Sequence, residues 1–375
     1  MDNNYSNSRY QKQEMLKEFG LEGQHKLSLA KVLVIGAGGL GCPALLYLAA
    51  AGVGNIGIVD FDVVELSNLQ RQVLYTMEDI GKHKAETAAQ KLKAINPEIQ
   101  IVFYNKQISN ENALELIAGY DLVIDGSDNY LTRYLVNDAC VLLNKPLVYG
   151  AVLRFEGQVG VFNLADPISK IKTNYRDLFP NPPDPAYSFS CNDVGVLGVL
   201  PGIIGTMQAT EAIKIILVIG KVLHNCMITY NALENSFYQF DISPNEEFLM
   251  TIPKDIPAFL TFNYERYCNP KHDLEITIEN FENLLSTEQL TIIDVREHHE
   301  FPIVDDFIFK KIPLSEFETG IFSISRENKI VLFCHSGKRS LQAMEILKSN
   351  FPEVEAYSLK GGILAWEKFK KMNNE

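Results

Sequence analysis

A glycine-rich turn near the start of the chain constrains the fold more than any other feature of the sequence. It reads Gly36-Ala37-Gly38-Gly39-Leu40-Gly41, and it lies between an apolar strand candidate, Lys31–Ile35, and an apolar helix candidate, Pro43–Ala51. Glycines let a backbone approach a phosphate closely, and the free N–H groups at a helix N-terminus attract an anion. The turn therefore predicts a nucleotide-binding unit built from a strand and a helix.

Strand and helix patterns alternate after this turn. The further strand candidates are the short apolar runs Asn55–Asp60, Ile99–Tyr104, Leu122–Asp125 and Pro146–Gly150. Such alternation is typical of an α/β fold with a Rossmann-like, doubly wound and mostly parallel sheet. We expect an added antiparallel part from Gly157–Asn163 and from a strand pair within Tyr230–Ile242, with a buried helix over Gly198–Ile219 between them.

The pattern changes in the last third of the chain. Three prolines interrupt residues 251–275, which we expect to form a linker after a first domain of residues 1–250. Strand candidates Thr291–Val295 and Lys329–Phe333, with helix candidates beside them, then predict a small second α/β domain over residues 276–375.

Charge and cysteine content exclude several classes of protein. The chain has 34 Lys and Arg against 47 Asp and Glu, a net charge of −13, which argues against a nucleic-acid partner because such binding needs a basic surface. The six cysteines form no C-x-x-C pair, which argues against a disulfide scaffold and favours the reducing cytoplasm. Met1–Tyr10 lacks the apolar core of a signal peptide. Glycines and a proline interrupt the uncharged stretch Val32–Gly54, so we expect no membrane span there.

Charged side chains gather where the predicted strands end. Asp60 ends one strand, Asp128 and Asn129 follow another, and Arg71 and Lys84 come between them. Ligands of open α/β sheets bind at the carboxyl ends of the strands, so we expect these groups to share one crevice. The diphosphate of NAD needs no such cationic cluster. A Mg²⁺-triphosphate attacked by a carboxylate does, because cations offset the repulsion between the anions. Ordinary surface ion pairs are the alternative for Arg71 or Lys84 taken singly.

These motifs together resemble the MoeB/ThiF/HesA adenylyltransferases, the bacterial relatives of ubiquitin-activating enzymes. The resemblance rests on Arg9-Tyr10, Gln13, Gly36–Gly41, Ala51–Gly54, Asp60–Asp62, Ser67–Gln72, Asp128-Asn129 and Glu156–Gln158. It implies a homodimer that binds ATP and Mg²⁺ and adenylates the C-terminal Gly-Gly carboxylate of a ubiquitin-like sulfur-carrier protein of the MoaD or ThiS type.

The resemblance also implies roles for individual residues. Asp128 would hold Mg²⁺, and Arg71 and Lys84 would act in catalysis by stabilising the departing pyrophosphate. The implied ATP-binding residues are Gly39, Asp60, Ser67, Asn68, Leu69, Gln70, Arg71, Lys84, Asp128 and Asn129.

The sequence departs from the family pattern in two places. Lys12 stands where the family has an arginine that reaches the ATP of the partner subunit, so the charge is kept but the planar, bidentate contact is lost. Asn174 and Asp177 replace the first C-x-x-C pair of a zinc site found in many members, and the region of the second pair, Asn245–Thr251, has no cysteine. Because a structural zinc ion needs about four such ligands, we predict no zinc site.

Two cysteines are candidates for covalent chemistry. Cys191 resembles the family cysteine that in some members becomes linked to the carrier, although passive packing is the alternative and Asp193 disfavours its thiolate. Cys334 opens the loop Cys334–Ser340, where backbone N–H groups, a helix N-terminus and two cations favour a thiolate or a persulfide. With Asp294–Glu297 and Lys360–Trp366, this loop makes residues 276–375 resemble a single rhodanese domain, which implies that sulfur is carried on Cys334.

The combined prediction is an enzyme that is both an adenylyltransferase and a sulfurtransferase. Its first domain would activate the carrier as an acyl-adenylate, and Cys334 would deliver sulfur from a cysteine desulfurase or similar donor to give a thiocarboxylate. The pathway would be molybdopterin synthesis, thiamine synthesis or tRNA thiolation. Two alternatives stay open, namely a ubiquitin-type activating enzyme with a carrier thioester on Cys191, and a non-catalytic, sulfur-sensing scaffold silenced by Lys12.

Overall fold

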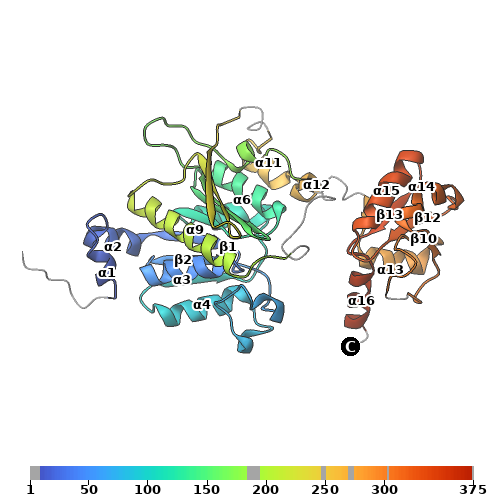
Figure 1. Ribbon diagram of the computed structural model, residues 1–375, viewed down its shortest axis with the longest axis horizontal. Coiled ribbons are helices and arrows are strands. Elements are labelled where there is room, and N and C mark those ends of the chain that lie inside the picture. The colour runs from blue at the N-terminus through green and yellow to red at the C-terminus, as the bar shows by residue number, and fades with distance from the viewer. Residues whose placement is uncertain (1–8, 184–194, 246–250, 269–273, 302–303, 374–375) are drawn as a thin grey trace, which may run out of the picture. The chain divides into compact units, whose positions relative to one another are not determined.

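The chain forms two compact units, the first ending at Tyr264 and the second beginning at Glu265 (Figure 1). The computed structural model describes residues 9–183, 195–245, 251–268, 274–301 and 304–373. Within these residues no helix combines the length and the apolar character that crossing a lipid bilayer requires.

The first unit is built on one eight-stranded sheet. Its order is β3 (Gln100–Tyr104), β2 (Asn55–Val59), β1 (Lys31–Ile35), β4 (Leu122–Asp125), β5 (Leu147–Leu153), β6 (Glu156–Phe162), β7 (Cys226–Asn231) and β8 (Ser236–Asp241). Neighbours from β3 to β5 pair in parallel, and those from β5 to β8 pair antiparallel. The strand order reverses between β1 and β4, which is where open α/β sheets form their ligand crevice. The predicted fold class is confirmed.

Helices cover both faces of this sheet. One group comprises α2 (Gly20–Leu29), α3 (Gly41–Ala51), α4 (Lys84–Ile95) and α9 (Val199–Leu217), and α3 packs along α9. The other group comprises α5 (Asn110–Ala118), α6 (Tyr130–Leu142), α7 (Tyr175–Leu178) and α11 (Ile256–Thr261). The central strands β1 and β4 are buried almost throughout because both faces are covered, which explains their continuous apolar sequence.

Element boundaries differ from the sequence-based expectation in two informative places. The sequence pattern predicts a helix over Lys82–Ile95, but α4 begins at Lys84, because His83 forms an antiparallel bridge with Val63. Strand β5 runs on to Leu153 beyond Gly150, because it continues as a hairpin with β6 through Arg154, which has a positive φ of 52°.

Two short helices lie in the region predicted as a linker. Helix α11 and helix α12 (Tyr264–Cys268) fall within residues 251–275, and α11 packs against α5 and α6. Asp255 caps α11 by accepting a hydrogen bond from the Ala258 N–H, and Phe259 is fully buried. Burial of this aromatic ring explains why the segment folds onto the first unit.

The second unit has a five-stranded sheet in which every pairing is parallel. The order is β11 (Lys310–Lys311), β10 (Leu290–Asp294), β12 (Lys329–Phe333), β13 (Ala356–Leu359) and β9 (Glu275–Ile276). Its helices include α13 (Ile278–Thr287), α14 (Phe317–Gly320), α15 (Lys338–Asn350) and α16 (Gly362–Asn373). One core cluster contains Met344 and Leu332, and another contains Phe281 and Trp366, whose rings pack edge to face at 5.5 Å.

Candidate active sites

The glycine turn joins β1 to α3 at the reversal of strand order. A Cβ atom on Gly41 would lie 1.9 Å from the Gly36 carbonyl oxygen, so only glycine fits at this position. Gly36 has a φ of +89° and packs against Gly126, which follows β4. The segments that follow β1 and β4 therefore pack together at Gly36 and Gly126. Because these residues have no side chains, a ligand in the crevice can approach the backbone.

Asp60 is tied to this turn. Its Oδ2 accepts a hydrogen bond of 2.7 Å from the Ala37 N–H, and its Oδ1 accepts one of 2.8 Å from the Asp62 N–H. Burial raises the pKa of Asp60, while Lys84 acts to lower it. The carboxylate is thus oriented by the backbone, and each oxygen keeps a lone pair for a further donor.

Lys84 and Arg71 lie beside the same turn. Lys84 is almost fully buried, and its Nζ contacts Asp62 Oδ2 at 2.9 Å. Arg71 donates to the Ser67 carbonyl oxygen at 3.1 Å, and its Cδ would lie 3.6 Å from a Cβ on Gly39. Two cations therefore border the glycine turn, one held by a carboxylate and the other by a weaker contact with the backbone.

The segment Ser67–Gln72 is held by both local and distant contacts. The buried Asn68 ends the short helical turn Leu66–Asn68, and its side chain accepts a hydrogen bond from the N–H of Glu65 at the start of that turn. Gly198, just before α9, approaches the side chain and backbone of Gln70 so closely that a Cβ would lie 2.3 Å from Gln70 Oε1. The start of α9 therefore fixes the position of this segment against the sheet.

Around the end of β4 lie several buried polar atoms that have no hydrogen-bond partner in the described part of the chain. They are Asp125 Oδ2, Ser127 Oγ, Arg133 Nε and Gln208 Oε1. Hydrogen bonds connect their residues, because Arg133 donates to the Ser127 carbonyl oxygen, the Ser127 N–H donates to Asp125 Oδ1, and Gln208 Nε2 donates to the Asp125 carbonyl oxygen. Unpartnered buried polar atoms are rare, and a polar ligand would satisfy them.

Sequence reasoning missed this group apart from Asp125, which it took only as a strand end. Of the residues that it did select here, Asp128 is exposed, and Asn129 caps α6 by accepting a hydrogen bond of 2.9 Å from the Thr132 N–H. The side-chain NH2 group of Asn129 takes no part in this cap. No set of three potential metal-binding side chains occurs among the described residues.

Lys12 lies apart from the other predicted nucleotide-binding residues of its own chain. It is on α1 (Gln11–Glu14), where Gln13 donates to the Ala51 carbonyl oxygen at 2.7 Å. Ala51 ends α3, whereas the glycine turn begins it. Helix α3 has 11 residues, so about 16 Å of helix separates the two ends.

Hydrogen bonds join residues 174–177 to residues 245 and 251, the two segments that correspond to the zinc-binding cysteine pairs of many MoeB/ThiF/HesA members. Asp177 Oδ2 accepts from the Asn174 N–H at 2.8 Å, and Asp177 Oδ1 accepts from the Asn245 N–H at 2.8 Å. Arg176 donates to Thr251 Oγ1 at 3.3 Å. The segments are therefore linked by a carboxylate and a guanidinium at the place where we predict no zinc.

Cys334 follows β12 and is almost fully buried. Its Sγ accepts a hydrogen bond of 3.1 Å from the Gly337 N–H, and the Ser340 hydroxyl lies 3.6 Å away. Gly362 packs directly against this loop, because a Cβ there would lie 2.5 Å from the Cys334 carbonyl oxygen. Burial raises the pKa of the Cys42 thiol, on helix α3, to about 12. Cys191 lies outside the described residues.

Arg339, one of the two cations that the sequence places in this loop, has an acidic partner. The two terminal guanidinium nitrogens of Arg339, Nη1 and Nη2, contact the carboxylate of Glu300, with Nη2 2.7 Å from Oε2. Arg339 lowers the pKa of Glu300 to about 2. Sequence reasoning missed Glu300, because the pair joins residues 39 positions apart.

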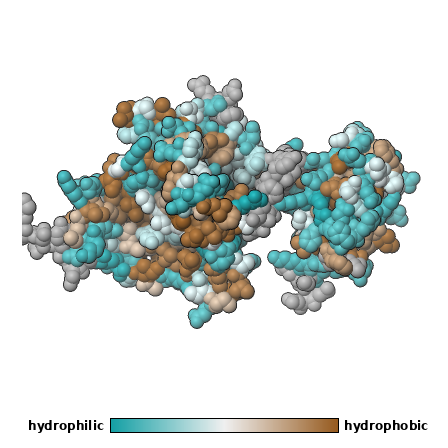
Figure 2. Space-filling view, viewed as in Figure 1, coloured by the Kyte–Doolittle hydropathy of each residue, from teal (hydrophilic) through white to brown (hydrophobic). Residues whose placement is uncertain are grey.

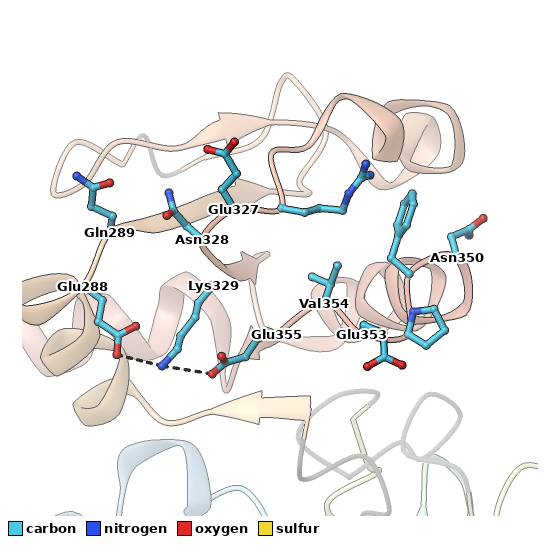
Figure 3. A pocket seen from close by; sticks show the side chains of 12 residues that line it. Glu288, Gln289, Glu327, Asn328, Lys329, Asn350, Glu353, Val354 and Glu355 are labelled. Atoms are coloured by element: carbon cyan, nitrogen blue, oxygen red, sulfur yellow. Dashed lines mark hydrogen bonds and ion pairs between the residues drawn. The ribbon is translucent and has the colours of Figure 1, made fainter.

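An open hollow in the second unit lies at the other end of β12 from Cys334. Figure 3 shows Lys329, the first residue of β12, paired with Glu288 at 3.0 Å and with Glu355 at 3.3 Å. Cys334 follows the opposite end of this five-residue strand, about 16 Å away. The hollow is therefore not part of the cysteine site.

Comparisons with known proteins match both units of the chain. The ThiF family matches residues 10–249, and the rhodanese-like domain matches residues 277–369. The probable adenylyltransferase/sulfurtransferase MoeZ of Mycobacterium tuberculosis is 41% identical over 373 residues, covering 96% of this chain and 93% of the relative. Adenylyltransferase and sulfurtransferase MOCS3 of Culex quinquefasciatus is 37% identical over 389 residues, covering 97% and 88%.

Further matches cover the first unit. The sulfur carrier protein adenylyltransferase of Thermus thermophilus is 51% identical over 237 residues, covering 63% of this chain and 88% of the relative. The crystal structure of E. coli MccB with ATP has a TM-score of 0.55 at 24% identity, covering 65% of this chain and 73% of that one, and supports the fold alone. The predicted enzyme class is confirmed, since the chain is an adenylyltransferase and a sulfurtransferase. It belongs to the ThiF family and carries a rhodanese-like domain after its ThiF domain.

Proposed function

We propose that the first unit uses ATP to adenylate the C-terminal carboxylate of a ubiquitin-like sulfur carrier ending in Gly-Gly, and that the second unit supplies sulfur to the activated carbonyl. The observation that carries this proposal is the presence in one chain of two places suited to an anion. One is a glycine turn bordered by Arg71 and Lys84, and the other is the buried Cys334, whose sulfur lies within hydrogen-bond reach of the Gly337 N–H and the Ser340 hydroxyl. The relatives named for both activities support it.

The residues at the first site fit ATP. Asp60 has free lone pairs for a ribose hydroxyl, and the backbone N–H groups of the turn that contains Gly39 would bind the phosphates. Ser67, Asn68, Leu69 and Gln70 would line the same crevice, and the Asn129 amide would complete it. The unpartnered atoms at the end of β4 would then bond to the nucleotide or to the carrier tail.

In the adenylation step the carrier carboxylate attacks the α-phosphorus and pyrophosphate leaves. Arg71 and Lys84 would stabilise the negative charge that grows on the phosphates. Mg²⁺, if bound by Asp128 together with phosphate oxygens and water, would neutralise more of it, and a single protein carboxylate is ordinary for this ion.

We propose that the active form is a homodimer. Lys12 is a helix length from the glycine turn of its own chain, so only a second copy would bring it to a nucleotide. Apolar side chains are exposed on the first unit in Figure 2, and Leu21 and Leu29 on α2 and Tyr47 on α3 are among the exposed residues. Burial of such groups against a second copy is favourable.

Sulfur transfer would use Cys334 as a persulfide. Its outer sulfur attacks the acyl-adenylate and displaces AMP, which leaves the carrier joined to Cys334 through an acyl disulfide. A second thiol, for which we propose Cys191, then attacks the Cys334 sulfur and releases the thiocarboxylate. The resulting disulfide returns to thiols through a cellular dithiol reductant, and a cysteine desulfurase or a similar protein persulfide reloads Cys334. With these reactants the enzyme would work in the reducing cytoplasm.

The test is the intact mass of candidate Gly-Gly carriers of molybdopterin, thiamine and tRNA-thiolation pathways. Each is incubated with the protein, ATP and Mg²⁺, with thiosulfate in one series and cysteine plus a cysteine desulfurase in another. We expect one carrier oxygen to be replaced by sulfur, and Cys334→Ser to abolish this while pyrophosphate exchange continues. Exchange without sulfur transfer in either series contradicts the second half of the proposal. A stable carrier thioester on Cys191 that forms with Cys334→Ser indicates an activating enzyme of the ubiquitin type instead.

A further inference from the structure

Two buried serines connect the sheet of the second unit to the sulfur of Cys334. Ser340 lies in the first turn of α15, Ser358 lies on β13, and both side chains are fully buried. Ser358 Oγ is 2.8 Å from Ser340 Oγ, and Ser340 Oγ is 3.6 Å from Cys334 Sγ. A chain of hydroxyl groups therefore ends at the reactive sulfur.

The geometry gives Ser340 a choice of acceptor. Its hydroxyl can donate to the Gly337 carbonyl oxygen at 2.9 Å or to Cys334 Sγ, but it has a single hydrogen. Ser358 has two acceptors as well, Ser340 Oγ and the Gly337 carbonyl oxygen at 3.5 Å. When Ser340 turns its hydrogen to the sulfur, Ser358 can still donate to either oxygen, so neither hydroxyl loses its partner.

Burial makes a second donor important. Only 1% of Cys334 is exposed, and a buried anion is costly unless hydrogen bonds replace the lost water. The Gly337 N–H supplies one such bond, whereas the charge of Arg339 is taken up by Glu300. A hydroxyl that can rotate toward the sulfur is suited to a group that alternates between neutral thiol and thiolate.

We propose that Ser340 and Ser358 form a hydroxyl relay that stabilises the Cys334 thiolate and so sets the pH at which this cysteine accepts sulfur. The inference rests on the proposed persulfide role of Cys334. In the loading step the thiolate attacks the outer sulfur of a donor persulfide, a bond forms between Cys334 Sγ and that sulfur, and the donor leaves as its own thiolate. Ser340 contacts the reacting atom, and Ser358 is a positioning residue that acts through Ser340.

The relay acts before loading rather than after it. In the persulfide the negative charge lies on the outer sulfur, and Cys334 Sγ becomes a neutral, weak acceptor. Ser340 then returns its hydrogen to the Gly337 carbonyl oxygen, which is the shorter of its two contacts. The relay thus favours the empty thiolate that must attack the donor.

The test is the pH dependence of alkylation of Cys334 in the full-length, unloaded protein. Iodoacetamide reacts with the thiolate, and the peptide that contains Cys334 is quantified by mass spectrometry, which separates it from the other cysteines. We expect Ser340→Ala to raise the midpoint by about one pH unit, equal to about a tenfold loss of thiolate below both midpoints. Ser358→Ala should give a smaller shift of the same sign, and the double variant should shift no further than Ser340→Ala.

Ser336→Ala is the matched control, because Ser336 is exposed in the same loop and should leave the midpoint unchanged. An unshifted midpoint in Ser340→Ala with an unchanged melting temperature overturns the relay, as does an equal shift in the control. If Ser340→Ala does not fold, the midpoint of Ser358→Ala decides the proposal, because the Ser358 hydroxyl does not contact the sulfur. An unshifted midpoint in that variant then overturns the relay. The assay needs no carrier, so failure to sulfurate any carrier contradicts the proposed function alone.

Discussion

Arg176 and Asp138 form a two-point ion pair with both side chains fully removed from solvent. Arg176 Nε lies 2.9 Å from Asp138 Oδ1 and Nη2 lies 2.7 Å from Oδ2, while the Tyr264 hydroxyl donates to the same Oδ2 at 2.8 Å. The guanidinium also stacks on the Tyr134 ring at 4.9 Å. One buried charge pair thereby joins α6, α7 and the first residue of α12.

Replacing one member of this pair should be far more harmful than replacing both. We expect Arg176→Met to lower the free energy of unfolding by about 3–5 kcal/mol, because the Asp138 carboxylate is left buried without its positively charged partner. The double change Arg176→Met with Asp138→Leu should cost much less than the sum of the single changes. Urea unfolding followed by far-UV circular dichroism measures these values, and additive losses would count against the pair as the cause.

Removal of metal should leave the fold unchanged. Since a carboxylate and a guanidinium link residues 174–177 to Asn245 and Thr251, we expect zinc content well below one ion per chain. The melting temperature should be the same before and after dialysis against a chelator. A stoichiometric zinc signal by plasma mass spectrometry, lost together with stability on chelation, contradicts this prediction.

Gly41 should tolerate no side chain. Its Cβ would meet the Gly36 carbonyl oxygen, so we expect Gly41→Ala to deform the turn and to abolish ATP binding. The matched control is Gly202→Ala on α9, where a Cβ meets no atom within 4 Å and should be neutral or stabilising by up to about 1 kcal/mol. Equilibrium binding of a fluorescent ATP analogue separates the two variants. Equal affinities would show that the turn does not hold the nucleotide.

Lys84 should be required for chemistry. We expect Lys84→Met to slow ATP–pyrophosphate exchange by about 10²–10³-fold, a loss typical of removing one charged or hydrogen-bonding stabiliser of a developing anion. Lys91→Met serves as the control, because Lys91 lies on the same helix as Lys84 but pairs with Asp79, outside the cluster. Similar losses in both variants would assign the effect to α4 stability instead.

The ion pair between Arg339 and Glu300 predicts a pH-dependent stability. Arg339 lowers the pKa of Glu300 from 4.5 to about 2, so folding favours the ionised carboxylate. This contribution is present above about pH 4.5 and is lost as the pH falls toward 2. The melting temperature of wild type should exceed that of Glu300→Gln at pH 6, and the difference should shrink between pH 4.5 and 3. A difference that stays constant over this range contradicts the assignment.

Local sequence patterns predicted the fold and both sites to the extent that neighbours in the chain determine them. The turn Gly36–Gly41 and the loop Cys334–Ser340 are each a strand, a turn and a helix in succession, so their context was visible. Glu300, Arg176 and Gln208 were not predicted, because their partners lie 38 or more residues away. Nothing local distinguishes Glu300 from Glu297, or the buried Arg176 from a solvated loop residue.

The two sites differ in the kind of charge that they offer an anion, and this difference has a consequence for ionic strength. Arg71 contacts a backbone carbonyl oxygen and presents its full charge at a crevice, and mobile salt ions screen such a charge. Cys334 Sγ is held by an uncharged N–H group and, in our proposal, by hydroxyl groups, and Arg339 of the same loop is paired with Glu300. Fixed dipoles in a buried site are screened little. Rising salt should therefore slow activation of the carrier well before it slows the loading of sulfur, and the balance between the two half-reactions becomes a function of the ionic medium.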